Sequence, residues 1–333
     1  MGVTRRHLLG SGGVAAAAAT VLAAPRVARA DWPERPIRVV VPFAAGGNLD
    51  TLTRIVAPVM SQRLGQPVVV ENRAGATGTI GTEFVARSQP DGYTLIVGSN
   101  SAMVINPIVM PRTPYDPVRD FAPIALGFRT PNVLVISRRL PVETLADFIA
   151  YAKARPGQVA CGSPGSGSSN HLLIELFSMT TGAGLVHVPY RASSGSAPDL
   201  MAGNLACSMD QISTALPLHR DEKVRIIGVA MPQRLPLLPD VPTLAEVGLP
   251  DGGLVAFIGL LAPAGTPRDA IMKIRDALAA ALADPPTRER IEGLGSVVAT
   301  GEDVTPEGFA RLMERERELS RRAAQAAGLL QGG

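Results

Sequence analysis

Cysteine, aromatic residues and long apolar runs are all scarce in this 333-residue sequence. Aromatic residues make up 4% of the chain and charged residues 18%, against a hydrophobic content of 46%. This balance is typical of a globular protein and excludes a disordered one. Beyond residue 30 no run reaches the ~18 consecutive apolar residues of a membrane helix, so no span is expected there. The length suggests two domains, at ~150 residues each.

Only two cysteines are present, Cys161 and Cys207, and both lie in strand-like runs. Two buried free thiols are the expected arrangement, and a disulfide between Cys161 and Cys207 is the alternative. Two distant cysteines and the few histidines of the chain show no metal-ligand spacing. We therefore expect neither a metal site nor a cofactor.

The first thirty residues have the pattern of a bacterial export signal. A twin-arginine start at 4–9 is followed by a weakly apolar run over 11–24 and by a cleavage site of the A-x-A type at 28–30. The apolar run is shorter than the ~20 residues of a spanning helix, which disfavours a membrane anchor. We predict a twin-arginine signal peptide over 1–30 and a periplasmic protein.

Removing that segment changes the charge balance. It holds four Arg and no acidic residue, so the formal net charge of +3 becomes −1 for residues 31–333. The high isoelectric point therefore comes largely from the signal, and no basic patch for nucleic acid or a membrane surface is implied. We expect no nucleic-acid partner and a monomeric protein.

Short apolar strands alternate with amphipathic helices along the chain. Strands are expected at 36–43, 67–72, 93–97, 133–137, 158–162, 185–188, 205–209, 224–230 and 254–261. Helices are expected at 49–64, 82–88, 142–154, 170–180, 267–282, 286–292 and 306–329, with a surface connection at 106–121. This alternation through short loops predicts an α/β fold with parallel sheets. The helical tail should pack back on the first unit, so that 31–131 with 254–333 forms lobe 1 and 132–253 forms lobe 2.

Three glycine-bearing loops, at 43–50, 73–81 and 162–171, join an expected strand to an expected helix. In open parallel sheets, ligands bind beyond the carboxyl ends of the strands. The Gly46-Gly47 turn directs backbone N–H groups and a helix dipole toward one place, which suits an anion. The sequence therefore predicts an anion site between two loops of lobe 1 and one loop of lobe 2.

Asp50 and Asp210 are the carboxylates nearest the predicted loop tips. Asp50 stands in the first turn of a helix, where the dipole favours an acid and Arg54 follows four residues later; ligand contact is the alternative. Asp210 directly follows a strand and suits a ligand amino or hydroxyl group. His171, in the first turn of its helix, is expected to pack or cap, again with ligand contact as the alternative.

Signatures of common enzyme classes are missing. No lysine follows glycine in a phosphate loop, the glycines of 75–81 lack the dinucleotide-binding spacing, and no serine is flanked as G-x-S-x-G. A Ser163 or Ser168 nucleophile with His171 or His187 as its base is the remaining catalytic alternative. The simpler expectation is that these serines donate hydrogen bonds and cap the helix.

A series of short motifs, in order along the mature chain, resembles the periplasmic solute receptors of tripartite tricarboxylate transporters, the Bug or TctC family. The first are WPERPIR at 32–38, VPF at 41–43 with Gly46-Gly47 and Asp50, LGQPVVVENR at 64–73, the 75–81 loop, PDGYTL at 90–95 and PYDP at 114–117. The later ones are GSxGxGS at 162–168, HVPY at 187–190, DLMAG at 199–203, LPDVPT at 238–243 and PAGTP at 263–267. Together these motifs cover the whole mature chain and are highly specific.

The resemblance implies a two-lobe type II periplasmic binding protein fold, each lobe a mainly parallel sheet flanked by helices, and it implies no catalysis. Family receptors hold a ligand carboxylate through backbone amides of the lobe 1 loops, often with bridging waters. On the matching positions this implies contacts from Phe43, Gly46, Gly47, Asp50, Ala76, Thr77 and Gly78. Lobe 2 would add Ser163, Gly167, Ser168 and His171, with Tyr190 and Asp210 near the distal end of the ligand.

Three positions depart from the family pattern. Ala44-Ala45 replaces Pro-Pro, the segment 255–259 lacks a tryptophan, and Arg191 replaces lysine. None of these changes removes an expected type of contact, and all of them leave the identity of the acid open.

We therefore expect a periplasmic receptor whose lobes close over a small organic carboxylate and deliver it to the permease subunits of a tripartite tricarboxylate transporter. The alternatives are a sensory receptor of the same fold that feeds a signalling kinase, and a periplasmic serine hydrolase. Mono-, di- and tricarboxylates, amino acids and aromatic acids all match this expectation.

Overall fold

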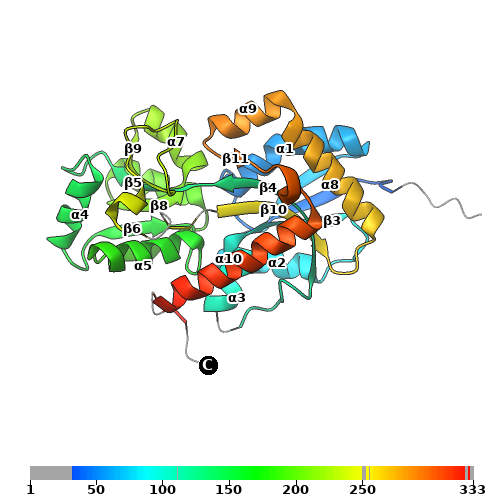
Figure 1. The fold of residues 1–333 in the computed structure, drawn as a ribbon, viewed down its shortest axis with the longest axis horizontal. Coiled ribbons are helices and arrows are strands. Elements are labelled where there is room, and N and C mark those ends of the chain that lie inside the picture. The colour runs from blue at the N-terminus through cyan, green and yellow to red at the C-terminus, as the bar shows by residue number, and fades with distance from the viewer. Residues whose placement is uncertain (1–31, 111, 250–252, 255, 327–328, 331–333) are drawn as a thin grey trace, which may run out of the picture. The chain divides into compact units, whose positions relative to one another are not determined.

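Two β-sheets flanked by helices make up the described part of the chain (Figure 1). A computed structural model describes residues 32–110, 112–249, 253–254, 256–326 and 329–330. The chain separates into the units Met1–Trp32 and Pro33–Gly333, and the fold described below is that of the second unit. The predicted signal peptide at 1–30 lies outside the described residues. Within those residues, no helix has the length and apolar character to cross a membrane.

The first sheet has six strands in the order β11-β4-β10-β3-β1-β2. Their bounds are Ile37–Val41 (β1), Val68–Asn72 (β2), Thr94–Ser99 (β3), Phe121–Thr130 (β4), Ala256–Pro263 (β10) and Val297–Val298 (β11). The helices that accompany this sheet are Asn48–Leu64 (α1), Thr79–Ala86 (α2), Asn106–Val109 (α3), Arg268–Ala283 (α8), Pro285–Gly293 (α9) and Pro306–Ala326 (α10). The tail thus returns to the first sheet, because β10 pairs with both β3 and β4.

The second sheet has five strands in the order β7-β6-β8-β5-β9. They are Asn132–Ser137 (β5), Ala160–Ser163 (β6), Val186–Pro189 (β7), Cys207–Gln211 (β8) and Val224–Ala230 (β9). Its helices are Leu145–Lys153 (α4), Ser169–Thr181 (α5), Ala197–Ala202 (α6) and Ile212–Arg220 (α7). Apolar clusters cover both faces of this sheet, one around Phe148 and Phe177 and one around Leu200 and Leu216.

Most strands of each sheet run in one direction, as expected, but both sheets also contain strands of the opposite direction. In the first sheet β1 pairs in parallel with β2 and β3, whereas β10 runs antiparallel to β3 and β4. In the second sheet β5 runs antiparallel to β8 and β9, while β6 pairs in parallel with β7 and β8. Besides the two-residue strand β11, which is antiparallel to β4, the strands of opposite direction are β5 and β10. Each of these two follows a point where the chain passes from one sheet to the other. Such a strand follows no βαβ crossover, so the strand–helix alternation does not predict its direction.

Strand β4 lies within the first sheet, although the sequence did not predict it. Pro123 and Gly127 are residues that normally argue against a strand interior. The pairing of β4 with β10 has register shifts that leave out Ile124 and Gly127, so these two residues bulge from the ladder. The expected surface connection at 106–121 is also partly wrong, because its first residues form α3 after a buried π-helical turn at Ser101–Ile105.

The two cysteines lie at paired positions of β6 and β8 and are fully buried. Both are free thiols, so the alternative disulfide is not formed in this structure. Burial, and then the neighbouring Cys161 thiol, raise the pKa of the Cys207 thiol. Cys207 Sγ donates a weak hydrogen bond to the carbonyl oxygen of Ala160, 3.6 Å away.

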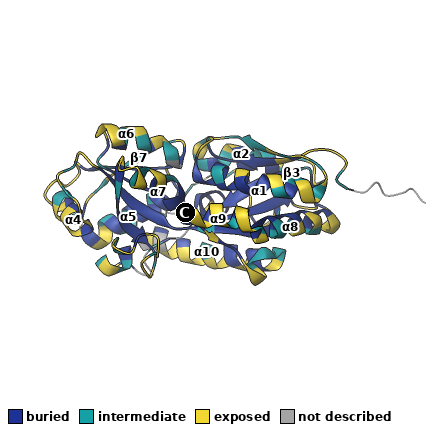
Figure 2. Cartoon of the chain, turned by 90° about the horizontal axis from the view of Figure 1, so that it is seen from above, coloured by how far each residue is buried: buried dark blue, intermediate teal, exposed yellow. Residues whose placement is uncertain are grey.

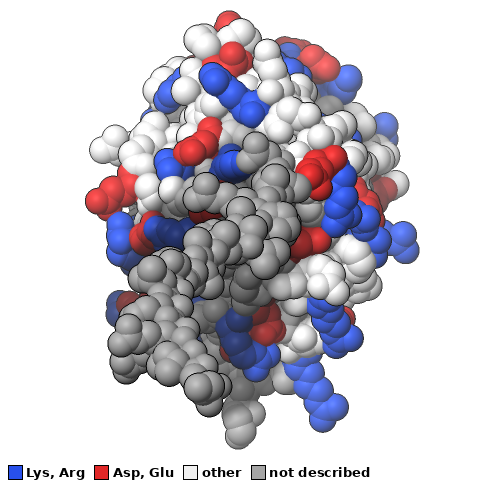
Figure 3. All heavy atoms as spheres, turned by 90° about the vertical axis from the view of Figure 1, so that its right-hand side faces the viewer, with Lys and Arg blue, Asp and Glu red and all other residues white. Residues whose placement is uncertain are grey.

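The central strands are buried, the edge strands β2, β7 and β11 are partly exposed, and the longer helices expose one face each (Figure 2). On the face shown in Figure 3, Lys and Arg side chains are interspersed with Asp and Glu. Exposed ion pairs such as Arg35–Asp91 and Arg234–Glu246 contribute little to stability, because water screens them. The buried apolar clusters therefore dominate the stability of the fold.

Close contact between α10 and β10 gives a test of this packing. A Cβ on Gly259 would lie 2.4 Å from Phe309 Cζ and 2.7 Å from the carbonyl oxygen of Ala125, and Phe309 is fully buried. We expect Gly259→Ala to lower the free energy of unfolding, measured by urea denaturation, by about 1–3 kcal/mol, the usual cost of overpacking. Gly293→Ala at the end of α9 is the control, since its Cβ would meet nothing within 4 Å. Equal effects of the two substitutions would contradict the close packing.

Candidate functional site

The turn between β1 and α1 exposes the start of a long helix. Gly46 adopts a φ of +79°, a left-handed conformation that favours glycine. Gly47 stands immediately before α1 and has no side chain with which to cap it. The backbone N–H groups of the first turn therefore have no side-chain partner at the cap, and the helix dipole adds partial positive charge at this end.

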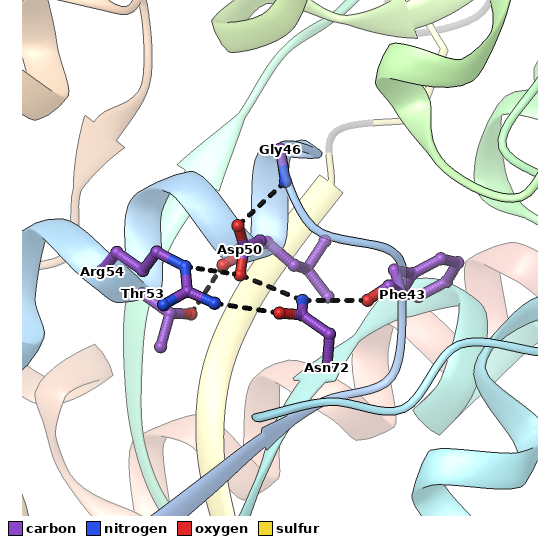
Figure 4. Close-up of polar contacts among 7 residues, drawn as sticks. Phe43, Gly46, Asp50, Thr53, Arg54 and Asn72 are labelled. Atoms are coloured by element: carbon purple, nitrogen blue, oxygen red, sulfur yellow. Dashed lines mark hydrogen bonds and ion pairs between the residues drawn. The ribbon is translucent and has the colours of Figure 1, made fainter. Parts of the chain in front are cut away.

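The carboxylate of Asp50 holds this turn in place (Figure 4). It accepts hydrogen bonds from Gly46 N at 2.9 Å, Arg54 Nε at 2.8 Å and Asn72 Nδ2 at 3.0 Å. Asn72 Nδ2 also donates to the carbonyl oxygen of Phe43 at 3.1 Å. Burial raises the pKa of Asp50, but the hydrogen bonds from Arg54, Gly46 and Asn72 outweigh it, so the net pKa is lowered. Asp50 is therefore ionised at neutral pH. Its carboxylate already accepts the hydrogen of the Gly46 amide, so this amide is not available to a ligand.

The 73–81 loop contains two non-glycine residues in the left-handed region, Ala76 with φ of 45° and Thr77 with φ of 51°. Each such conformation costs on the order of 1–3 kcal/mol and persists only where its surroundings hold it. Asn106 Nδ2 donates to the carbonyl oxygen of Thr77 at 2.9 Å. Thr77 Oγ1 donates to the carbonyl oxygen of Ser166 at 2.5 Å. This loop therefore joins elements of the first sheet to the 162–171 loop of the second.

Within the 162–171 loop, the serines bond to the protein itself. Ser163 Oγ lies 2.5 Å from His187 Nε2 and 3.1 Å from both the amide and the carbonyl oxygen of Gly165. Ser168 Oγ accepts from the amide of His171 at 3.1 Å and so caps α5. The capping role predicted for a serine of this loop is confirmed for Ser168.

His171 and His187 stack on each other with ring centroids 3.8 Å apart. His171 Nδ1 accepts the amide hydrogen of Gly167 at 3.1 Å. Burial lowers the pKa of both rings, and the neighbouring His171 lowers that of His187 further, to about 4. Both rings are therefore neutral at pH 7, and His187 is too weak a base to activate Ser163 well.

A pocket lies where strands from both sheets end. It is lined by Phe43, Gly47, Asn48, Leu49, Ser99, Asn100, Ser101, Pro164, Ser169, Asn170, Ala192, Gln211 and Ala256. These residues lie at or just beyond the carboxyl ends of β1, β3, β6, β7 and β8 or at the starts of α1 and α5, with Ala256 at the start of β10. Within the described part of the chain, no ionisable side chain lines it. Its volume is about 20 Å³, room for little more than one water molecule, so the walls must separate to admit a larger solute.

Of the residues predicted to bind a ligand, the structure brings Phe43 and Gly47 to this pocket. Gly46 and Asp50 lie in the turn behind it and bond to each other. The remaining first-sheet candidates, Ala76, Thr77 and Gly78, form the strained 73–81 loop rather than the pocket wall.

The predicted second-sheet residues lie around the pocket rather than in it. Gly167, Ser168 and His171 line a neighbouring cavity with apolar residues that include Ile105, Val109 and Met110. Tyr190 Oη donates to Asp199 Oδ2 at 2.7 Å; burial and then that carboxylate raise the pKa of Tyr190 to about 12. Asp210 Oδ1 accepts from the amide of Gln211 at 2.7 Å and from Thr214 Oγ1 at 2.9 Å.

Several polar residues of the pocket were missed by sequence reasoning. Ser99, Asn100 and Ser101 directly follow the apolar core of β3, and a polar triplet at the carboxyl end of a strand could have identified them. Asn170 and Gln211 each stand beside a residue that was predicted. Asn48 is the first residue of α1, between the predicted Gly47 and Asp50.

Three amide side chains connect the pocket to the passage between the sheets. Gln211 Nε2 donates to Asn170 Oδ1 at 2.8 Å, and Asn170 Nδ2 donates to Asn132 Oδ1 at 3.0 Å. Asn132 Nδ2 donates in turn to the carbonyl oxygen of Leu254 at 2.6 Å. All three amides are at most 5% exposed. Asn132 and Leu254 lie at the two points where the chain passes between the sheets, so pocket walls and connections form one hydrogen-bonded unit.

The role of Asp50 is testable without a ligand. Asp50→Asn keeps the shape of the side chain but removes the charge that accepts three hydrogen bonds. We expect it to lower the free energy of unfolding at pH 7 by about 1–3 kcal/mol, measured in urea. Because the pKa of Asp50 is lowered on folding, this difference is present above the ordinary aspartate value of 3.8 and shrinks as the pH falls below it.

Asp221→Asn is the matched control for that measurement. Asp221 pairs with Lys223 at 3.1 Å on the surface, where an ion pair contributes little. A loss in Asp50→Asn no larger than in the control would contradict the organising role of Asp50.

Comparison with known proteins places the chain in a family. Residues 52–318 match the model of the tripartite tricarboxylate transporter family receptor. A protein of Pseudomonas sp. strain P51, described as a UPF0065 protein in the tcbD-tcbE intergenic region, is 37% identical over 95% of this chain and 92% of its own. The protein BugT of Bordetella pertussis is 39% identical over 74% of this chain and 75% of its own.

Solved structures show the same fold. A protein of R. palustris determined with adipate is 34% identical, with a TM-score of 0.86 over 90% of this chain and 99% of its own. MatC from Rhodopseudomonas palustris, determined with bound malate, is 34% identical, with a TM-score of 0.83 over 87% of this chain and 99% of its own. The periplasmic binding protein BugD is 32% identical, with a TM-score of 0.86 over 90% of this chain and all of its own. This chain therefore belongs to the tripartite tricarboxylate transporter receptor family, whose members are periplasmic solute-binding receptors.

Proposed function

We propose that this receptor binds a small organic carboxylate in the pocket between the two sheets and delivers it to the membrane subunits of a tripartite tricarboxylate transporter. The observation that carries the proposal is the uncapped start of α1, which opens onto a pocket lined by polar but uncharged side chains. An anion there is stabilised by backbone N–H groups and the helix dipole without a cationic side chain. The structures of two relatives contain adipate and malate, which supports this choice of ligand class.

The two helices that reach the pocket differ in what they offer an anion. Ser168 caps α5, and the amide of Ser169 donates to Ser101 Oγ at 3.3 Å, so this end already has acceptors. The start of α1 has no side-chain cap at Gly47. We therefore place the carboxylate at α1 and the remainder of the ligand toward Asn170 and Gln211.

Binding requires the two sheets to move relative to each other. We assign 31–131 with 254–333 to one lobe and 132–253 to the other, with Pro131 and Leu254 at the two connections. Thr77 and Ser166 bond from one lobe to the other, as do Ser101 and Ser169, which is the arrangement of a closed receptor. A ligand that makes more contacts in the closed form than in the open one shifts the equilibrium toward closure.

We further propose that the protein has no catalytic function. The Ser163–His187 contact resembles part of a hydrolase site, but Ser163 is 2% exposed and His187 is a weak base. In the described residues, no cluster of three potential metal ligands is present, so binding should proceed without a metal. Export through a twin-arginine signal at 1–30, a monomeric state and the permease partner complete the proposal.

A thermal-shift panel tests the ligand class. Adipate, L-malate, citrate, L-aspartate and benzoate are compared with adipamide, the uncharged diamide of adipate. A receptor saturated at a hundred times its Kd gains about 2.7 kcal/mol, which for a chain of this size raises Tm by about 4 °C. We expect such a shift from at least one acid, no shift from adipamide, and no change when a chelator is added.

Three results would contradict the proposal. They are a panel without any shift, an equal shift from adipamide, and a shift abolished by the chelator. Hydrolysis of p-nitrophenyl esters by the purified protein, lost in Ser163→Ala, would support the hydrolase alternative instead.

A further inference from the structure

The side-chain amide of Asn48 carries a buried hydrogen-bond donor that has no partner among the described residues. Asn48 is the first residue of α1, is 1% exposed and lines the pocket. Its Nδ2 atom has no hydrogen-bond partner among the described residues. Three other buried side-chain atoms share this condition, namely Asn106 Oδ1, Arg275 Nε and Ser320 Oγ, but Asn48 is the one of the four residues that lines this pocket.

The oxygen of the same amide is already occupied. Ser213, in the first turn of α7, donates its hydroxyl hydrogen to Asn48 Oδ1, and both side chains are at most 5% exposed. Ser213 follows β8 of the second sheet, whereas Asn48 follows β1 of the first. The contact thus joins elements that follow strands of the two sheets. It occupies the oxygen of the Asn48 amide and leaves the nitrogen without a partner among the described residues.

An unpaired buried donor is costly, and native proteins retain few of them. Leaving such a group unsatisfied lowers the stability of the folded protein by as much as a typical destabilising substitution does. A cost of this size is removed when a solute supplies the missing acceptor. The uncapped backbone of α1 beside Asn48 favours an acceptor that is negatively charged.

We propose that Asn48 Nδ2 donates a hydrogen bond to a carboxylate oxygen of the bound acid and that Ser213, from the opposite lobe, orients it for this role. Asn48 is then a specificity-determining residue and Ser213 a positioning residue. The inference rests on the proposed function and sharpens it, because the ligand end that faces α1 must be an acceptor. An ammonium group at that end is rejected, since it would meet the N–H groups of both the amide and the helix.

Asn48→Asp is the most informative substitution, because it keeps the shape and replaces the donor by an anionic acceptor. By isothermal titration at pH 7.5, we expect it to weaken binding of adipate and L-malate at least 100-fold. Burial and the neighbouring bound anion raise the pKa of the introduced carboxyl group, which is a donor once protonated. The ratio of wild-type to variant affinity should therefore narrow at least tenfold between pH 7.5 and pH 5, which loss of packing alone does not predict.

A charge-matched control tests whether any added negative charge on α1 weakens binding. A second variant replaces Asn48→Asp if that variant does not fold. Gln62→Glu adds the same charge to the exposed far end of α1, about 21 Å from Asn48 along the helix, and should change affinity less than threefold. Asn48→Ala should weaken binding about tenfold and serves if the Asp variant fails to fold. Ser213→Ala should weaken binding several-fold in the wild type but have no effect in Asn48→Ala, because the amide it orients is absent.

The outcomes separate the two claims. If adipate or malate binds the wild type and both Asn48 variants within threefold of each other, the role of Asn48 is refuted and the receptor function stands. If Ser213→Ala weakens binding equally in both backgrounds, the positioning role of Ser213 is refuted. If no acid binds the wild type, the proposed function fails and this inference fails with it.

Discussion

The buried carboxylate of Asp50 is the interaction on which the site depends. One ionised side chain accepts hydrogen bonds from the amide of Gly46 and from Arg54 and Asn72, and so fixes both the turn before α1 and its distance from β2. Because Asp50 lies in the first turn of the helix, its charge also stabilises the helix start. It satisfies the turn without reaching the pocket, which leaves the first amides of α1 for a solute.

The rest of the pocket is assembled from strands that belong to different sheets. Asn132 and Leu254, at the two connections, are joined through Asn170 to Gln211 at the pocket wall. A solute that displaces Gln211 therefore also affects Asn132 and Leu254, through the hydrogen bonds of Asn170. This is the physical requirement for coupling binding to lobe movement, since an element with two arrangements must contact both places.

Much of the fold was predictable because it depends on local pattern. Helix α1 and its end at Gly65, in the left-handed conformation with φ of 67°, follow from apolar periodicity and glycine chemistry. Strand β4 was not predictable, because Pro123 and Gly127 act as strand breakers unless a partner strand tolerates bulges. Whether Asp50 bonds to its own turn or to a ligand was equally undecidable, since Asn72 approaches it from 22 positions along the chain.

The sequence predicted loops that form the pocket, but it did not predict most of the residues that line it. The three glycine loops were located correctly, and Phe43 and Gly47 line the pocket as well, but several other pocket-lining residues stand one or two positions from those predicted. Ser168 caps α5, and the next residues, Ser169 and Asn170, line the pocket. Neighbouring residues of a helix point in directions about 100° apart. A motif therefore locates the loop, but it does not show which of its side chains point into the pocket.

The most direct test of the central claim is a crystal structure of the protein with the acid that stabilises it most. We predict one carboxylate at the start of α1, with an oxygen within about 3.2 Å of Asn48 Nδ2 and of a backbone N–H of the first turn. We also predict that Asp50 keeps its bonds to Gly46 and Asn72. A carboxylate bound instead in the neighbouring cavity of Gly167 and His171, or paired with Arg54 after displacing Asp50, would contradict these predictions.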